Sequence, residues 1–461
     1  MSNAEGGPVL TRDEVDLLVV QASELVTCRT GPKGAVGGDL EDLEVIWDGA
    51  VAVDGGRIVE VGTSAEMSRR YQAREVLDAE GRVVSPGLVD PHSHLVHGGS
   101  RHEEYQGMVT GRAGGKPGGG IHYTVSITRR TGSGKLGSGA LRDLEIMLCH
   151  GTTTLEAKSG YGLDRETELR LLTVLAGLRH PVEVVPTYLA AHVAPLEEEL
   201  SRAGYVGLVM EVLEEARHFA EYCDVFCDPV GFSQEECLRI ATRAKELGLG
   251  LRVHADQTGW AGGAELAARL GATSADHLDH VSEEGIRALA QSGTVGVLLP
   301  GANFHLMELT PGLEGGHSVP PPKAFLLERV QRMIEAGVRL ALSTDYNPGS
   351  SPTPSMQMVM QLAARLYRLS YAAIWHMSTI NAAHALGRGG DRGSLEPGKR
   401  ADILIWTVPE HGLAINRFGV NQVSMVLKNG RVVVRDGRPE HGSVPLDAPS
   451  GTLGGGTPTD G

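Results

Sequence analysis

Two histidines stand close together at the end of a strand-like segment early in the chain. His92 and His94 follow residues 84–89, which are rich in strand-forming side chains, and they are two positions apart. On an extended backbone, side chains two positions apart leave from the same side of the strand. Two neutral imidazoles held in this way suit a borderline divalent cation such as zinc. Because such a pair also recurs by chance, a metal site requires further ligands elsewhere in the chain.

Two further candidate ligands end strand-like segments that lie far along the chain. His254 ends the segment 251–254, and Asp345 follows the segment 339–343. Three imidazoles and one carboxylate leave coordination positions open for water and substrate, as in catalytic metal sites. The segment 224–230 offers no lysine that could be carboxylated to bridge two metals. We therefore predict one divalent metal ion per chain, zinc or iron, although this ligand set also admits manganese.

These ligands can meet only if the fold brings the ends of distant strands together. Helical patterns with apolar residues at three- and four-residue spacing, such as 165–178, 234–247, 283–291 and 323–336, alternate with strand-like segments. The strand-like segments are 83–89, 152–157, 182–187, 224–227, 251–254, 274–277, 295–299 and 339–343. Eight such units predict an α/β fold with a (β/α)8 barrel, in which the carboxyl ends of all strands meet at one mouth. A doubly wound open sheet is the alternative, but no Gly-x-Gly-x-x-Gly motif follows a first strand.

Both ends of the chain are rich in short strands. Asp54-Gly-Gly56 and Asn429-Gly430 are hairpin turn signals between such strands. We predict a small β-sandwich domain built from residues 1–84 and 390–446, on either side of a barrel over residues 85–389. Residues 447–461 are rich in Gly, Thr and Pro, and we expect a disordered tail there.

The composition excludes several classes of function. The chain has 461 residues, of which 41% are hydrophobic and 21% charged, as in ordinary globular proteins. Its net charge of -15 opposes binding to nucleic acids or anionic membranes, so an anionic substrate must meet local cations inside a pocket. We see no apolar run long enough for a membrane span and no signal peptide pattern. The five scattered cysteines are expected to be reduced thiols, which favours a cytoplasmic protein.

Residues 86–94 and 343–345 resemble the amidohydrolase superfamily. More narrowly, the segments 90–101, 158–163, 275–278 and 345–350 resemble the imidazolonepropionases of histidine degradation, and the likeness extends over residues 14–435. This resemblance implies an amidohydrolase-type barrel and hydrolysis of the ring amide of 4-imidazolone-5-propanoate to N-formimidoyl-L-glutamate. The habit of the superfamily also suggests a homodimer.

Three residues carry the catalytic steps that the resemblance implies. Water activated by a divalent metal is a nucleophile near neutral pH, and Asp345 can take its proton. His277, at the end of the sixth strand, is placed to hold or activate that water. Gln257 stands where some family members carry Glu, and an amide can donate and accept hydrogen bonds but cannot act as an acid or base. We therefore expect Gln257 to orient the imidazolone ring.

The remaining expected site residues bind substrate. Arg101, in a Gly-rich loop after the first strand, can clamp the propanoate through two parallel hydrogen bonds. Tyr161 lies between two glycines after the second strand, and His192 matches a substrate-contacting histidine of the family. Three residues of the turn after the metal-binding aspartate complete the set: Asn347, Gly349 and Ser350.

Two other functions remain open from the sequence. A metal-dependent deaminase of a nucleobase or other amino-heterocycle could use the same ligands, but a neutral nucleobase would not require a carboxylate clamp such as Arg101. A binding protein with a vestigial metal is a second alternative, against which the intact ligand set counts.

Overall fold

The computed structural model describes residues 12–110, 119–197, 201–306 and 323–440. One of its two sheets contains eight strands, each parallel to its neighbour in the sequence. These are β6 Leu88–Asp90, β7 Thr152–Lys158, β8 Glu183–Ala191, β9 Tyr222–Cys227, β10 Gly250–Ala255, β11 Ser274–His277, β12 Val295–Leu298 and β13 Leu340–Leu342. The predicted barrel is therefore confirmed, whereas the predicted tail, residues 447–461, lies outside the described residues.

The barrel closes just beyond the ends of its first and last strands. The backbone N–H of Thr344 donates to Asp90 Oδ1 at 3.0 Å, and that of Asp345 donates to the carbonyl of His92 at 3.1 Å. The N–H of His94 donates to the carbonyl of Tyr346 at 2.8 Å. The closing contacts are thus made by the segments that carry three of the predicted metal ligands.

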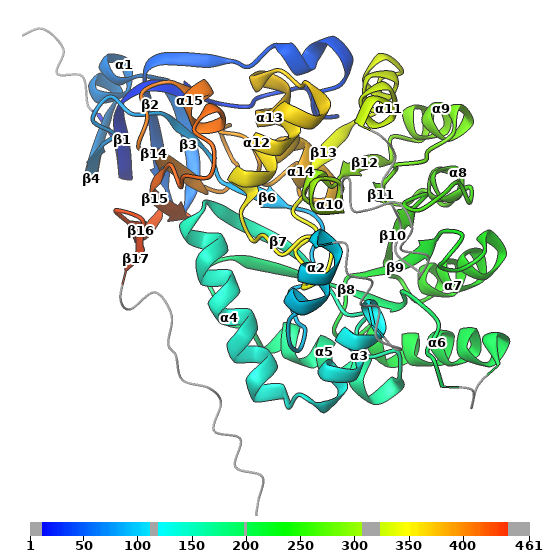
Figure 1. The fold of residues 1–461 in the computed structure, drawn as a ribbon. Helices are drawn as coiled ribbons and strands as arrows, with labels where there is room; N and C mark the ends of the chain where they lie inside the picture. The colour runs from blue at the N-terminus through cyan, green and yellow to red at the C-terminus, as the bar shows by residue number, and fades with distance from the viewer. Residues whose placement is uncertain (1–11, 111–118, 198–200, 307–322, 441–461) are drawn as a thin grey trace, which may run out of the picture.

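Helices surround the strands on the outside of the barrel (Figure 1). They are α4 Ser133–Cys149, α5 Arg165–Gly177, α6 Arg202–Ala216, α7 Gln234–Glu246, α8 Gly263–Leu270, α9 Glu283–Ser292 and α11 Lys323–Glu335. Local sequence explains their ends: Ser233 and Glu236 form a capping box at the start of α7, and Gly293 ends α9 in the left-handed conformation. The four helices predicted above coincide with α5, α7, α9 and α11 to within one residue.

The remaining helices lie in connections after three barrel strands and between strands of the small domain. α2 and α3 follow the first barrel strand and lie across one end of the barrel in Figure 1. These remaining helices are α1 Ser64–Arg70, α2 His102–Val109, α3 Ile121–Arg130, α10 Pro300–Leu306, α12 Met356–Tyr367, α13 Tyr371–Ser378, α14 Ile380–Ala385, α15 His411–Asn416 and the 3-10 helix η1 Gly37–Glu41.

The two ends of the chain share one mixed sheet of nine strands. β14 pairs antiparallel with β5, which joins strands from opposite ends of the sequence (Figure 1). Alternate residues of β1 pack into separate apolar clusters, Leu17 and Val19 in one and Leu18 and Val20 in the other, so both faces of this strand are buried. The strands are β1 Asp13–Val26, β2 Val45–Asp54, β3 Arg57–Thr63, β4 Tyr71–Asp78, β5 Val84–Pro86, β14 Ile403–Trp406, β15 Val423–Lys428, β16 Arg431–Arg435 and β17 Arg438–Pro439. The small β domain from both chain ends is confirmed, while its boundaries at 84/85 and 389/390 stay predictions.

The predicted first barrel strand, residues 83–89, is wrong as a single element. β5 belongs to the small sheet and β6 to the barrel, and Gly87 lies between them. The N–H of Gly87 donates to the carbonyl of Asp402 at 2.9 Å. A Cβ at this position would lie 2.3 Å from Thr153 Oγ1, so only glycine lets the chain pass from one sheet to the other here.

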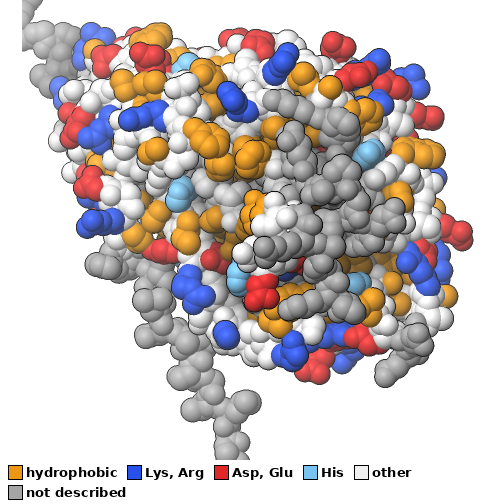
Figure 2. Space-filling model, in the orientation of Figure 1, with side chains coloured by type: hydrophobic (Ala, Val, Ile, Leu, Met, Phe, Trp, Pro, Cys, Tyr) orange, Lys and Arg blue, Asp and Glu red, His pale blue; other side chains and the backbone are white. Residues whose placement is uncertain are grey.

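The described surface carries charged side chains of both signs. Figure 2 shows Lys and Arg side chains interspersed with Asp and Glu on this face of the molecule. Among the described residues, no helix combines the length and the apolar character that a membrane crossing requires. All five cysteines are free thiols.

Candidate metal centre and active site

Histidines and an aspartate from four barrel strands converge at the mouth of the barrel. His92 and His94 follow β6, His254 lies near the end of β10, His277 ends β11, and Asp345 follows β13. Their ligand atoms form three overlapping groups, each with all atoms within 4.8 Å of one another. The groups are His92, His254 and His277; His94, His192 and His254; and His92, His94 and Asp345. All four predicted ligands lie in this cluster, although no single group contains all of them.

The backbone at two strand ends is bent to aim these side chains inward. His277 has φ 75° and Asp345 has φ 50°, both in the left-handed region that residues other than glycine seldom adopt. Such conformations persist where the surrounding structure imposes them, and they concentrate at functional sites. The strained residues here are the two that we expect to handle the attacking water.

The cluster contains buried nitrogen atoms that require a partner. His92 Nε2 lies 3.4 Å and His94 Nε2 lies 3.6 Å from the same atom, Asp345 Oδ1. His92 Nε2 and His254 Nε2 are buried without a hydrogen-bond partner among the described residues. Buried polar atoms are rarely left unpaired, because the loss of hydration is costly. Imidazole nitrogens and a carboxylate oxygen are suitable ligand atoms for a divalent cation, so the cluster is a potential metal site.

Burial sets the protonation of the cluster. It lowers the pKa values of His92, His94 and His277 well below the ordinary histidine value, and neighbouring positive groups add to this effect. The imidazoles are therefore neutral, which is the form that binds metals. Burial also raises the pKa of Asp345 well above its ordinary value, and a nearby cation would favour its ionised form.

Acceptors behind the histidines fix the orientation of their rings. His92 Nδ1 donates to Asp276 Oδ2 at 2.6 Å, and His254 Nδ1 lies 2.9 Å from Asp224 Oδ2. Because a carboxylate only accepts, His92 Nδ1 carries the proton and leaves its Nε2 lone pair for the site. The contact of His254 Nδ1 with Asp224 is close but lacks hydrogen-bond geometry.

The substrate-binding residues that we predicted line one cavity above the cluster. Its volume is about 170 Å³. The predicted residues in its wall are His94, Arg101, Tyr161, His192, Gln257, Asp345, Asn347, Gly349 and Ser350. Apolar side chains complete the wall, among them Met108, Ile121, Phe226 and Leu306. The structure thus brings together every predicted site residue, although their individual roles stay predictions.

The guanidinium of Arg101 is held in place from two sides. Its Nη2 and Nε lie 2.5 Å and 3.3 Å from the carboxylate of Glu104. Glu104 also accepts a hydrogen bond from the N–H of Gly120 at 2.9 Å. On the other side, a Cβ at Gly349 would lie 1.8 Å from Arg101 Nη1, so the guanidinium packs directly against that backbone. Sequence reasoning missed Glu104, for which the three-residue spacing from Arg101 was the available signal.

The turn after Asp345 is built by the side chain of Asn347. Its Oδ1 accepts hydrogen bonds from the N–H groups of Gly349 and Ser350, both at 2.8 Å. Its Nδ2 donates to the carbonyl of Asp345 at 2.6 Å and to Ser350 Oγ at 3.0 Å. The amide of Asn347 therefore fixes the turn that faces Arg101, and its predicted contact with substrate remains a prediction.

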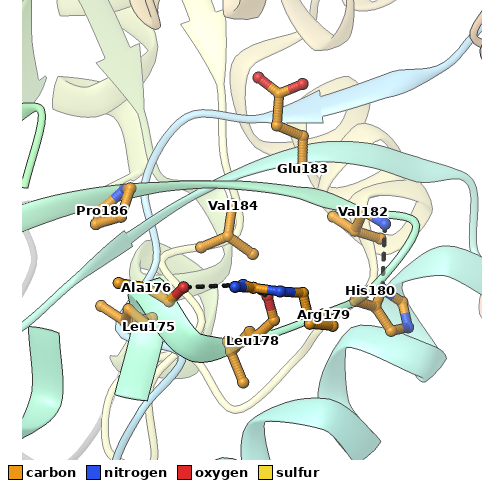
Figure 3. Close-up of a pocket in the computed structure, with 9 residues that line it drawn as sticks. All are labelled: Leu175, Ala176, Leu178, Arg179, His180, Val182, Glu183, Val184 and Pro186. Atoms are coloured by element: carbon orange, nitrogen blue, oxygen red, sulfur yellow. Dashed lines mark hydrogen bonds between the residues drawn. The ribbon is translucent and has the colours of Figure 1, made fainter. Parts of the chain in front are cut away.

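A second cavity, of about 360 Å³, lies between the end of α5 and the start of β8 (Figure 3). There Arg179 Nη1 donates to the carbonyl of Ala176 at 3.0 Å, and His180 Nδ1 accepts from the N–H of Val182 at 3.1 Å. These polar groups stabilise the loop itself. The cavity also lies at the amino end of a barrel strand, opposite the mouth where barrel enzymes place their active sites.

Comparison with known proteins identifies the family. Residues 145–434 match the amidohydrolase family, and residues 49–71 match the imidazolonepropionase-like composite domain of bacteria. An imidazolonepropionase from Geobacillus thermodenitrificans is 42% identical over 436 residues, which cover 92% of this chain and 99% of that protein. One from Treponema denticola is 43% identical over 406 residues, which cover 86% and 94%. The chain belongs to the imidazolonepropionase family.

Solved structures outside this family share the fold. A zinc-bound adenosine deaminase from Xanthomonas campestris superposes with a TM-score of 0.65 at 21% identity, over 94% of this chain and 95% of that one. An ochratoxinase from A. niger superposes with a TM-score of 0.66 at 19% identity, over 95% and 99%. At such identities the likeness concerns the fold alone, and it confirms the amidohydrolase-type barrel expected for an imidazolonepropionase family member.

Sequence reasoning missed a layer of charged residues beneath the histidines. Its members are Glu156, Lys158, Asp224, Arg252 and Asp276, and all are at most 1% exposed. The sequence did contain a signal, since each of these charged residues lies inside a strand that the fold buries. Charged residues are seldom buried unless they are paired, so partners were to be expected.

Proposed function

We propose that this chain hydrolyses the ring amide of 4-imidazolone-5-propanoate to N-formimidoyl-L-glutamate, a step of histidine degradation. One observation carries the proposal: a buried histidine–aspartate cluster and the guanidinium of Arg101 face the same small cavity. The cluster suits hydrolysis of an amide, and the guanidinium suits a substrate with a carboxylate. Membership of the imidazolonepropionase family supports the same reaction.

In this proposal, His92, His94, His254 and Asp345 hold one divalent cation, zinc or iron, since three nitrogens and one oxygen admit either ion. When bound, the cation supplies Lewis acidity, which activates water and polarises the ring carbonyl. Asp345 accepts the proton of the attacking water as the water oxygen bonds to the carbonyl carbon. His277, 5.5 Å from His92 and 5.4 Å from His254 between ring centroids, hydrogen-bonds to that water.

Breaking the ring C–N bond requires a proton on the departing nitrogen. Gln257 lines the cavity but cannot supply a proton, because an amide does not titrate. We therefore assign the return of the proton to Asp345, the same carboxylate that accepted it. The role of Gln257 is to orient the ring through its amide.

Two side chains hold the rest of the substrate. Arg101 binds the propanoate. His192 stacks parallel to His94 with ring centroids 5.0 Å apart, and its Nδ1 lies 3.0 Å from the carbonyl of Gly160. A carbonyl only accepts, so His192 Nε2 is an acceptor, and we propose that it receives a hydrogen bond from a ring N–H.

The test is an absorbance assay with freshly generated 4-imidazolone-5-propanoate, together with a metal analysis of the same sample. We expect chelator-sensitive loss of substrate and about one metal per chain. A metal-loaded chain that leaves the imidazolone unchanged but releases ammonia from an amino-heterocycle would instead be a deaminase.

We also propose that the chain acts as a homodimer in the cytoplasm. The free thiols of all five cysteines suit a reducing compartment. Light scattering of the purified protein would test the dimer, and a monomer mass at working concentration would contradict it.

A further inference from the structure

Lys158 lies beneath the metal ligands with its side chain completely buried. Its Nζ is 2.8 Å from Glu156 Oε1, 2.8 Å from Asp224 Oδ2 and 3.7 Å from Asp276 Oδ2. Lys158 ends β7, whereas Asp224 lies on β9 and Asp276 on β11. The ammonium therefore joins carboxylates from three separate barrel strands.

Two of these carboxylates contact predicted metal ligands through the same oxygen atoms. Asp276 Oδ2, which faces Lys158, is 2.6 Å from His92 Nδ1. Asp224 Oδ2, which also faces Lys158, is 2.9 Å from His254 Nδ1. Each oxygen atom thus lies close to both the ammonium and one imidazole.

Lys158 offsets part of the negative charge of this layer, and without it the excess negative charge would double. Three buried carboxylates face two cations, Lys158 and Arg252, and Arg252 Nε is 3.9 Å from Glu156 Oε1. Without the ammonium, Asp224 and Asp276 would repel each other in a site from which water is excluded. Such uncompensated buried charges are strongly unfavourable, so the carboxylates would bind protons or turn away. Either change removes an acceptor that fixes a histidine ring.

We infer that Lys158 is a positioning residue for the metal centre, because it holds Asp224 and Asp276 where they orient the rings of His254 and His92. The inference rests on the proposed metal-dependent function. It deepens that function by assigning a role to a residue that does not line the substrate cavity.

Removing Lys158 has a second effect on metal affinity, opposite in direction, so a measurement of affinity can distinguish the two. An ammonium beside a divalent cation repels it, so on that ground alone removing Lys158 would tighten metal binding. Loss of ring orientation weakens binding instead, and partners behind metal ligands typically contribute about 10–100-fold to affinity. We expect orientation to dominate, since the negative charges of the carboxylates beside Lys158 offset the charge of the ammonium.

The test compares K158M with K428M in the full-length chain. Methionine keeps an unbranched side chain without the charge. Lys428 is a matched control, because it is also buried, with its Nζ 2.7 Å from Asp402 Oδ2 and 2.9 Å from the carbonyl of Thr153. The zinc dissociation constant is measured by competition with a chromogenic chelator, after circular dichroism has established the fold. The visible spectrum of the cobalt(II) form reports ligand geometry.

We expect K158M to bind zinc about tenfold more weakly or worse and to shift the cobalt spectrum, with both properties unchanged in K428M. Unchanged or tighter zinc binding in K158M would overturn the inference. If K158M does not fold, E156Q/K158M, which removes one negative charge as well, is measured in its place. Failure of both variants to fold would also overturn it, since Lys158 would then serve the fold.

Zinc binding is measured without catalytic turnover, so the proposed hydrolysis and the inference on Lys158 can fail separately. A chain that binds one metal and does not hydrolyse the imidazolone would refute the proposed function and leave Lys158 testable. A K158M chain that binds metal as the parent does refutes only the inference.

Discussion

Replacing Gly349 with alanine should move Arg101 without changing its charge. The new Cβ would lie 1.8 Å from Arg101 Nη1 and 2.5 Å from Arg101 Cζ. Ordinary contacts between heavy atoms are about 3.5 Å, so the guanidinium must move by roughly 1.5–2 Å. Gly349 does not have a positive φ, so alanine does not strain the turn itself. The clashing group is the end of a flexible side chain, and the cost therefore falls on the position of the guanidinium rather than on the fold.

The expected increase in KM follows from the hydrogen bond between Arg101 and the propanoate that G349A would remove. A hydrogen bond to a charged group contributes about 1.5–3 kcal/mol, and about 1.4 kcal/mol corresponds to a factor of ten. If G349A removes one such bond to the propanoate, KM should rise by about 10–150-fold. If the guanidinium grips the substrate and the transition state equally, kcat should change much less.

A double-mutant cycle tests this reasoning. KM and kcat are measured from the loss of imidazolone absorbance for the parent, G349A, R101A and the double variant, each with its metal content determined. R101A should raise KM at least as much as G349A. In the R101A background, G349A should add little, because the group it displaces is gone. An unchanged KM in G349A, or an equal further increase in the double variant, would refute the proposed contact between Arg101 and the substrate.

Three further predictions concern the metal and the buried acids. D345N should retain the fold by circular dichroism but lose metal and most activity, because a ligand charge and the base disappear together; near-normal turnover would remove Asp345 from the mechanism. Chelation should lower the thermal midpoint of unfolding, and zinc should restore it, because a ligand that binds only the folded state stabilises that state; a midpoint insensitive to chelator would contradict the metal site. Burial raises the pKa of Asp279 to about 7, so its protonated form contributes stability that is complete below its ordinary pKa and is lost as the pH rises through about 7. D279N keeps an acceptor for Asn303 Nδ2, 3.0 Å away in the parent. Its unfolding free energy should exceed that of the parent at pH 8 by at most a few kcal/mol, and the difference should be smaller at pH 5. Equal stability of the two proteins at both pH values would contradict this.

The metal cluster could be predicted from the sequence because its members have distinctive chemistry at strand ends. A histidine or an aspartate directly after an apolar strand is visible in the sequence, and the parallel barrel brings all such ends to one mouth. This geometric rule placed His254 and Asp345 beside His92, although they are separated by long stretches of chain. The rule requires only the direction of each strand and no knowledge of side-chain contacts.

The division of the segment 83–89 between two sheets could not be predicted in the same way. A continuous apolar run is typical of a buried strand, whichever sheet it joins. This segment is divided at Gly87, which lies close to Thr153 and Asp402. Both of these residues are far away in the sequence. A glycine inside a strand pattern indicates such an approach but does not identify its partner.

The charged layer under the histidines was missed because its meaning depends on strands that are not neighbours. Glu156 and Lys158 alternate along β7 in a pattern that would also suit a half-exposed strand. In a (β/α)8 barrel, however, side chains from alternate strands form one interior layer, and β7, β9 and β11 are alternate strands. Lys158, Asp224 and Asp276 are therefore placed to meet, in a layer that apolar side chains usually fill. Opposite charges on alternate barrel strands, directly beneath strand-end histidines, thus predict a support for metal ligands, and this criterion would have found Lys158.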